Sequence, residues 1–298
     1  MNMVNRIISL VRLSCENSIK LAKAINSPII VIPVYDLISD ATATPNSLFK
    51  RIKKLGGFHS ALDYNGIVIL SFIMRDDLIE KFKLPEQYAE IINGLKPDFY
   101  FTPDGLTYEK QDNKSFFEII RILLLTAQLI KLCPNITPIG LVKGANETQI
   151  KAHRDSLKKL GINKFVFHTG DFFRNGSPDM IQRAKYYCSI IKRDGNPLML
   201  YGFGSPKLML EFSFVDYFIT YTHFVNAKHR KSFVGTEKEK YSNKPVYELA
   251  LHNFKELSNH LKKLRYQTKL FIGGKCKWEG ELQDQEPQLV VQSQKVKN

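Results

Sequence analysis

The chain has 298 residues, of which 44% are hydrophobic and 24% are charged. That length allows one large domain or two small ones, and the composition is that of an ordinary globular protein, which excludes a disordered or collagen-like chain. The 43 Lys and Arg residues against 29 Asp and Glu residues give a formal net charge of +14. An excess of this size favours a polyanionic partner, although many soluble proteins are simply basic.

The four cysteines lie far apart in the chain, at Cys15, Cys133, Cys188 and Cys276. Their number and spacing fit neither a disulfide scaffold nor a Cys-x-x-Cys metal site, which favours a reducing setting. The apolar stripe of residues 1–25 is interrupted by Asn, Arg, Glu and Lys, so we expect no signal peptide. Other apolar runs are too short or too interrupted to cross a bilayer. We therefore expect a soluble, cytoplasmic protein with no membrane partner.

Seven apolar runs are typical of strands, and most are continuously apolar, which favours a parallel sheet buried on both faces. In chain order they are residues 28–34, 66–73, 97–103, 137–143, 163–170, 197–203 and 214–221. Helical patterns separate or follow them, at residues 86–94, 114–132, 147–160, 178–192, 206–213 and 246–266.

This alternation predicts an α/β fold, a (β/α)8 TIM barrel, with a doubly wound open sheet as the alternative. The eighth strand would come from residues 268–274 or from an N-terminal segment. We expect the barrel domain to occupy residues 1–273, with its strands starting near residue 26. Residues 228–244 are polar and predict a loop, and residues 274–298 predict an irregular C-terminal tail.

Polar residues follow the predicted strands at their carboxyl ends, where the chemistry of such barrels gathers. Asp104 comes directly after an apolar strand, so its carboxylate is a candidate for catalysis or base recognition, although an Asx turn before Gly105 explains it as well. His168 and Asp171 form a second polar group, which a buried histidine and a turn carboxylate also explain. Gly202 opens a glycine-rich turn that leaves room for a flat or phosphorylated ligand.

Four segments of the chain occur in an order that is similar to a known family: LPEQYAEIINGLKPDFYFTPDGLTY, GLVKGANETQIKAHRDSLKKLGINKFVFHTGD, PLMLYGFGSPKLMLEFSFVDYF and LALHNFKELSNHLKKLR. Together they span residues 84–265 and resemble the tRNA-guanine transglycosylase superfamily, which includes the paralogues that insert 7-deazaguanine bases into DNA. The resemblance implies a (β/α)8 barrel that exchanges guanine in tRNA or DNA for a 7-deazaguanine through a covalent intermediate.

The resemblance also implies roles for individual residues. Asp104 matches the Asp with which the family reads the guanine edge, and a carboxylate accepts from the N1 and N2 hydrogens of guanine. Lys143 matches a base-reading Gln. The other substrate-binding candidates lie near the base or on the floor of its pocket, where an aromatic ring stacks on a purine: Ser71, His168, Gly170, Tyr201 and Gly202.

The chain departs from the family at the catalytic and metal positions. Ile219 stands where the family has its nucleophilic Asp, and the DSGGF motif that supplies an acid/base group is missing. The three zinc cysteines are missing too, so His252, at the place of the zinc histidine, lacks its co-ligands and we expect no metal and no other cofactor. An active enzyme would use another carboxylate, and the catalytic candidates are Asp104, Asp171 and Asp216, with Asp36 as a further one.

Two functions stay open: a base-exchanging transglycosylase, which the acidic groups at the strand ends favour, and a catalytically inactive paralogue that binds nucleic acid or a partner subunit as a homo- or heterodimer. An unrelated barrel enzyme for a small phosphorylated substrate is a third hypothesis, which leaves the ordered resemblance unexplained. The cations expected to contact tRNA or DNA are Lys228, Arg230, Lys231, Lys262, Lys263 and Arg265, although a solvated face explains them equally well.

Overall fold

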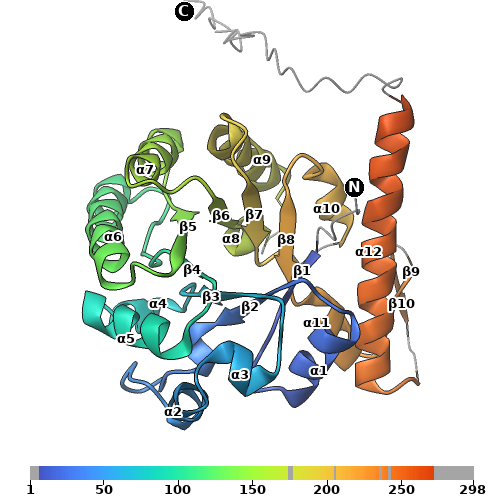
Figure 1. Cartoon of the computed structure of the whole chain (residues 1–298). Helices are drawn as coiled ribbons and strands as arrows, with labels where there is room; N and C mark the ends of the chain where they lie inside the picture. The colour runs from blue at the N-terminus through green and yellow to red at the C-terminus, as the bar shows by residue number, and fades with distance from the viewer. Residues whose placement is uncertain (1–6, 174–176, 205, 235–236, 241–242, 272–298) are drawn as a thin grey trace, which may run out of the picture.

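Eight parallel strands form a closed barrel in the order β1 to β8, with helices around its outside (Figure 1). The structure is a computed structural model that describes residues 7–173, 177–204, 206–234, 237–240 and 243–271. The strands of the barrel are β1 (Ile7–Leu10), β2 (Ile29–Pro33), β3 (Ile67–Ser71), β4 (Phe99–Phe101), β5 (Thr137–Val142), β6 (Phe165–His168), β7 (Leu198–Tyr201) and β8 (Tyr217–Thr220). The predicted (β/α)8 barrel is confirmed, and the open sheet is excluded.

The barrel is closed by its first strand. β1 pairs with β2 on one side and with β8 on the other, where Ile8 is the partner of Ile219. The strands therefore begin at Ile7 rather than near residue 26, and the N-terminal segment supplies the eighth strand. The alternative at residues 268–274 is wrong for its described part, because α12 (Val246–Phe271) is helical there. The predicted tail at residues 274–298 lies outside the described residues.

Side chains along each strand alternate between the barrel interior and the surrounding helices, as the two-residue period of a strand requires. Leu141 of β5, for example, belongs to the hydrophobic cluster inside the barrel, whereas Val142 packs beneath the helices. Further interior residues are Ile69, Val166 and Met199. Four of the predicted site residues each follow one of these interior residues by two positions, which directs them to the inner side of the carboxyl end: Ser71, Lys143, His168 and Tyr201.

Six helices agree with the sequence prediction: α5 (Pro85–Leu95), α6 (Asp112–Leu132), α7 (Glu147–Lys159), α9 (Pro178–Lys192), α10 (Pro206–Glu211) and α12. The helices α1 (Glu16–Ala24), α2 (Ser47–Lys54), α3 (Phe58–Leu62), α4 (Asp76–Ile79), α8 (Gly170–Phe173) and α11 (Thr222–Lys228) were not predicted. α2 and α7 begin at asparagines whose side chains accept a hydrogen bond from the first turn, which stabilises a helix start. In the described part of the chain, no helix has the length and hydrophobicity needed to span a membrane.

Residues 228–244 do not form the predicted loop but contain a hairpin, β9 (Lys231–Val234) with β10 (Glu237–Lys240). Phe233 is fully buried, and its N–H donates to the Asn253 side chain of α12 at 2.8 Å. Burial of Phe233 against α12 therefore stabilises strand structure in a segment whose polar composition predicts a loop.

Candidate functional site

Asp104 and Lys143 form an ion pair at the carboxyl ends of β4 and β5. Nζ of Lys143 lies 3.0 Å from Oδ1 of Asp104, and the N–H of Gly105 donates to the same oxygen at 2.7 Å. The Asp104 side chain is 3% exposed and that of Lys143 is 15% exposed. The carboxylate therefore makes the turn contact expected beside Gly105 and, in addition, a charge-assisted contact that the sequence did not predict.

The end of β5 is held in place from behind by α7. The N–H of Lys143 donates to Nδ1 of His153 at 3.0 Å, and His153 is fully buried. Burial lowers the pKa of His153 to about 4, so the ring is neutral near pH 7. Nδ1 also lies 3.1 Å from the carbonyl oxygen of Lys143. His153 thus fixes the backbone from which the Lys143 side chain extends toward Asp104.

Tyr201 lies at the top of the barrel interior, between other aromatic rings. Its ring packs edge to face on Phe101 and on His168, with centroid distances of 6.1 Å and 5.7 Å. Burial raises the pKa of the Tyr201 hydroxyl far above its usual range, and a hydrogen bond with Ser71 opposes this shift. Three of the predicted substrate-binding residues, Ser71, His168 and Tyr201, are therefore neighbours in the structure.

The ring of His168 fills the space that the two site glycines leave. A Cβ added to Gly170 would lie 2.8 Å from Nε2 of His168, and one added to Gly202 would lie 3.2 Å from Cδ2 of the same ring. Gly202 also has a φ of +82°, which side chains other than hydrogen rarely tolerate. The sequence predicted room for a flat ring at these glycines, and in this structure the flat ring beside them is that of His168.

A second ion pair, which the sequence analysis missed, joins the ends of β1 and β2. Nε and Nη2 of Arg12 donate to Oδ1 of Asp36 at 3.0 and 2.8 Å, and the N–H of Leu13 donates to Oδ2 at 2.7 Å. The guanidinium also lies 4.6 Å from the centre of the Tyr35 ring. The Asp36 carboxylate is 2% exposed, so its oxygens serve to bind Arg12 and the adjacent backbone. The feature that could have indicated Arg12 as a site residue is its position two residues after the end of the short strand β1.

Asp216 lies at the opposite end of the barrel from this group. Its Oδ2 accepts from Nζ of Lys192 at 2.5 Å and from the N–H of Leu198, the first residue of β7, at 2.8 Å. Asp216 was predicted to be a catalytic candidate within the apolar run 214–221, but β8 begins only at Tyr217, so Asp216 precedes the strand. Asp171 belongs to α8, directly after β6, and its side chain lies outside the described residues.

Ile219 and His252, which the sequence resemblance matches to a nucleophile and a zinc ligand, both have structural contacts here. Ile219 is fully buried in the cluster inside the barrel. Nε2 of His252 lies 3.1 Å from the carbonyl oxygen of Phe233 in the hairpin. Among the residues that the structure describes, no three His, Cys, Asp or Glu side chains gather as metal ligands would.

The predicted nucleic-acid cations after β8 are exposed beside α12. Nη1 of Arg230 donates to the carbonyl of Lys244 at 2.7 Å, and Nζ of Lys228 lies 5.4 Å from the centre of the Phe224 ring. Lys231 is exposed at the start of β9. The side chains of the other three cations, which are Lys262, Lys263 and Arg265 on α12, lie outside the described residues.

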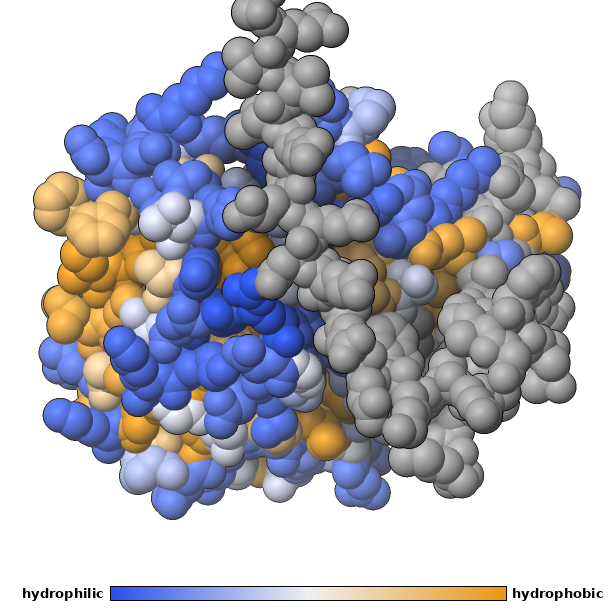
Figure 2. Space-filling model, turned by 90° about the horizontal axis from the view of Figure 1, so that it is seen from above, coloured by the Kyte–Doolittle hydropathy of each residue, from blue (hydrophilic) through white to orange (hydrophobic). Residues whose placement is uncertain are grey.

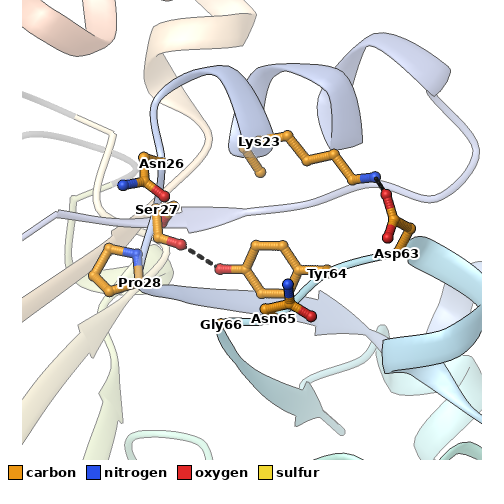
Figure 3. Close-up of a pocket in the computed structure, with 9 residues that line it drawn as sticks. Lys23, Asn26, Ser27, Pro28, Asp63, Tyr64, Asn65 and Gly66 are labelled. Carbon is orange, nitrogen blue, oxygen red and sulfur yellow. Dashed lines mark hydrogen bonds and ion pairs between the residues drawn. The ribbon is translucent and has the colours of Figure 1, made fainter.

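A separate pocket of about 360 Å³ opens at the amino ends of β2 and β3 (Figure 3). Lys23 pairs with Asp63 at 3.0 Å on its rim, and the Tyr64 hydroxyl donates to the carbonyl of Ser27. Burial raises the pKa of Tyr64 to about 12. These polar groups satisfy one another, and none of the predicted site residues lines this pocket.

No protein-family model matches the chain, and no curated protein matches it. These comparisons therefore assign the chain to no family.

Proposed function

We propose that the mouth of the barrel binds a guanine-type base, 7-deazaguanines included, and that the chain is a transglycosylase-like protein that recognises this base in nucleic acid. The ion pair of Asp104 and Lys143 carries the proposal, because it presents a carboxylate acceptor beside an ammonium donor. The lactam edge of guanine has the opposite pattern, an N1–H donor beside the O6 acceptor. The two edges are complementary.

Asp104 retains the capacity to accept such a donor. The hydrogen bond that its carboxylate receives from Gly105 and its ion pair with Lys143 both involve Oδ1. Oδ2 accepts none from the described residues and can receive N1–H or the exocyclic N2–H of the base. A 7-deazaguanine keeps N1, N2 and O6 and differs from guanine at position 7, so recognition of this edge accepts both bases.

The floor of the mouth suits a flat ring. His168 is half-buried, and its ring packs edge to face against Tyr201 and lies close to Gly170 and Gly202. A base held at Asp104 would stack on the His168 ring, since stacking on an aromatic side chain is favourable for any base.

Recognition without exchange is the activity that the described carboxylates support best. Exchange needs a carboxylate free to attack the anomeric carbon of the nucleotide. The position of the family's nucleophile is occupied by buried Ile219, Asp36 is held by Arg12, and Asp216 lies at the amino end. A base-exchanging enzyme is the second candidate, favoured by Asp171, whose backbone lies next to Gly170 at the start of α8.

Calorimetry with guanine and with a 7-deazaguanine tests recognition. We expect the wild type to bind both and Asp104→Asn and Lys143→Met each to lose at least tenfold in affinity, because each change leaves a polar group of the base unpaired at a cost of ~1–3 kcal/mol. Asp63→Asn is the matched control, since Asp63 is 95% exposed and borders the amino-end pocket. A wild type that binds neither base, or an Asp104→Asn variant that binds as tightly, would overturn the proposal.

A second experiment separates recognition from exchange. Incubation with radiolabelled guanine and either tRNA or duplex DNA reports exchange as label in the polymer. Base binding with no incorporated label supports recognition alone. Label that the wild type incorporates and Asp171→Asn does not would establish the exchange enzyme instead.

A further inference from the structure

Helix α6 carries an exposed hydrophobic stripe along its outer face. Phe116 is 50% exposed, Phe117 70%, Ile120 39% and Leu124 63%. These positions follow the three-to-four-residue spacing of one helix face. Figure 2 shows hydrophobic residues on the flank of the barrel where α6 lies in Figure 1.

The stripe is not explained by the packing of α6 on the barrel, since other residues do that. Ile122, Leu125 and Leu129 are buried on the opposite side of the helix. A helix that is apolar on both sides is normally covered on both sides. The four exposed side chains offer on the order of 400 Å² of apolar surface, which is in the range of the largest patch on a typical monomer, and such patches are often functional.

We propose that two copies of this chain associate through antiparallel α6 helices, related by a two-fold axis. A two-fold axis that passes between residues 120 and 124 sets Ile120 of one copy opposite Leu124 of the other, and this pair occurs twice. The same register sets Phe117 opposite Ala127, a large side chain against a small one on the same face of the helix. An isologous interface requires a surface that is complementary to a second copy of itself after a two-fold rotation, and this register meets that requirement.

Charge favours the antiparallel direction over the parallel one. Asp112 lies in the first turn of α6 and Lys131 in the last, and both are exposed. In the antiparallel register each Asp112 lies near the partner's Lys131, and the two helix dipoles attract. A parallel pair would bring like charges and like helix ends together. The stripe supplies about half of the ~800 Å² per partner of a standard interface, so we expect micromolar dissociation.

Sedimentation of the full-length protein over a range of concentrations tests the association. We expect a dimer that dissociates on dilution, and monomers at all concentrations for Ile120→Lys and for Leu124→Glu. Both positions are exposed on α6, so circular dichroism should report an unchanged fold. Leu55→Glu, which places a charge on a 53% exposed leucine at the end of α2, is the control and should leave the dimer intact. A wild type that stays monomeric at high micromolar concentration would overturn the proposal.

Mixing the two monomeric variants tests the register. In an antiparallel pair, Lys at position 120 of one variant meets Glu at position 124 of the other, and the second pair of the interface remains Ile with Leu. The mixture should therefore form one-to-one dimers that neither variant forms alone. Failure of the mixture to dimerise, or dimerisation of either variant alone, contradicts the antiparallel arrangement.

Discussion

Lys143 and Asp104 come from the ends of neighbouring strands, and Nζ of the one lies 3.0 Å from Oδ1 of the other with little access to water. An ion pair in this setting connects the ends of β4 and β5, and each buried charge is compensated by the other. Removal of one charge leaves its partner nearly buried and without compensation. The pair is therefore expected to contribute to stability, apart from the recognition proposed for it.

Lys143→Met should lower the free energy of unfolding by ~3 kcal/mol, because it leaves the Asp104 carboxylate without its cation. Adding Asp104→Asn to this variant should restore part of the loss, since a neutral amide oxygen still accepts from Gly105. Urea titration of the three proteins measures both effects. Lys185→Met, which removes a surface pair with Glu211, is the control and should cost less than about 1 kcal/mol. A double variant less stable than Lys143→Met alone would contradict the account.

Alanine at the two site glycines should destabilise the protein for different reasons. Gly170→Ala places its Cβ against Nε2 of His168, so the cost is steric and a second change, His168→Ala, should relieve it. Gly202→Ala adds strain at a φ of +82°, of ~1–3 kcal/mol, which His168→Ala cannot relieve. Thermal unfolding of the single and double variants distinguishes the two. Equal rescue of both by His168→Ala would show that the φ of Gly202 is not the cause.

The alternation of side chains along strands made much of the site predictable. Ser71, Lys143, His168 and Tyr201 continue the inward series of their strands, so their place at the mouth follows from their positions in the sequence. The contacts among them do not follow, because they depend on how neighbouring strands are staggered.

The errors in the sequence analysis arose at strand boundaries. Arg12 was missed because β1 has only four residues and lies in the apolar stripe of residues 1–25 that polar residues interrupt. Asp216 was misplaced because the apolar run around it begins before the strand does. The hairpin of β9 and β10 was read as a loop because its order comes from burial of Phe233 against α12. In each case, contacts between distant residues decided the local structure.

Stability should fall as the pH falls below 6.5, because two buried histidines resist protonation in the folded state. Burial lowers the pKa of His153 to about 4 and that of His223 to about 3, whereas in the unfolded chain both protonate near 6.5. The unfolded state then binds more protons, and each histidine contributes a slope of up to about 1.4 kcal/mol per pH unit. Urea midpoints between pH 6.5 and pH 5, above the range of most carboxylates, measure this slope.

His223→Leu should reduce that slope by about half and raise stability at pH 5 relative to the wild type. Neither ring nitrogen of His223 has a hydrogen-bond partner among the described residues, so an apolar replacement loses no such contact with them. A slope that His223→Leu leaves unchanged would show that this histidine is protonated in the folded protein or does not control the acid response.

Nucleic-acid binding, if it uses the cations after β8, should depend steeply on salt. Each phosphate contact that is lost should reduce the slope of log affinity against log salt by about 0.9 for duplex DNA. Lys228→Gln and Lys231→Gln together should therefore lower the slope by about 1.8. Fluorescence anisotropy with labelled tRNA or DNA measures it. Lys50→Gln with Lys54→Gln on α2 is the matched control, and an equal effect there would argue against the specific surface.

The closure of the barrel by β1 has a consequence for how the protein is made. Ile8 pairs with Ile219, so β1 is synthesised before the other strands of the barrel and completes its pairing only when β8, the last strand of the barrel, has been made. Until β8 appears, the nascent sheet keeps two open edges with unpaired backbone groups, and such edges invite pairing with other chains. The last contact of the barrel is also its longest-range one, which slows folding. Synthesis of this protein therefore includes an interval in which protection by a chaperone matters more than it would for a chain with local strand pairing.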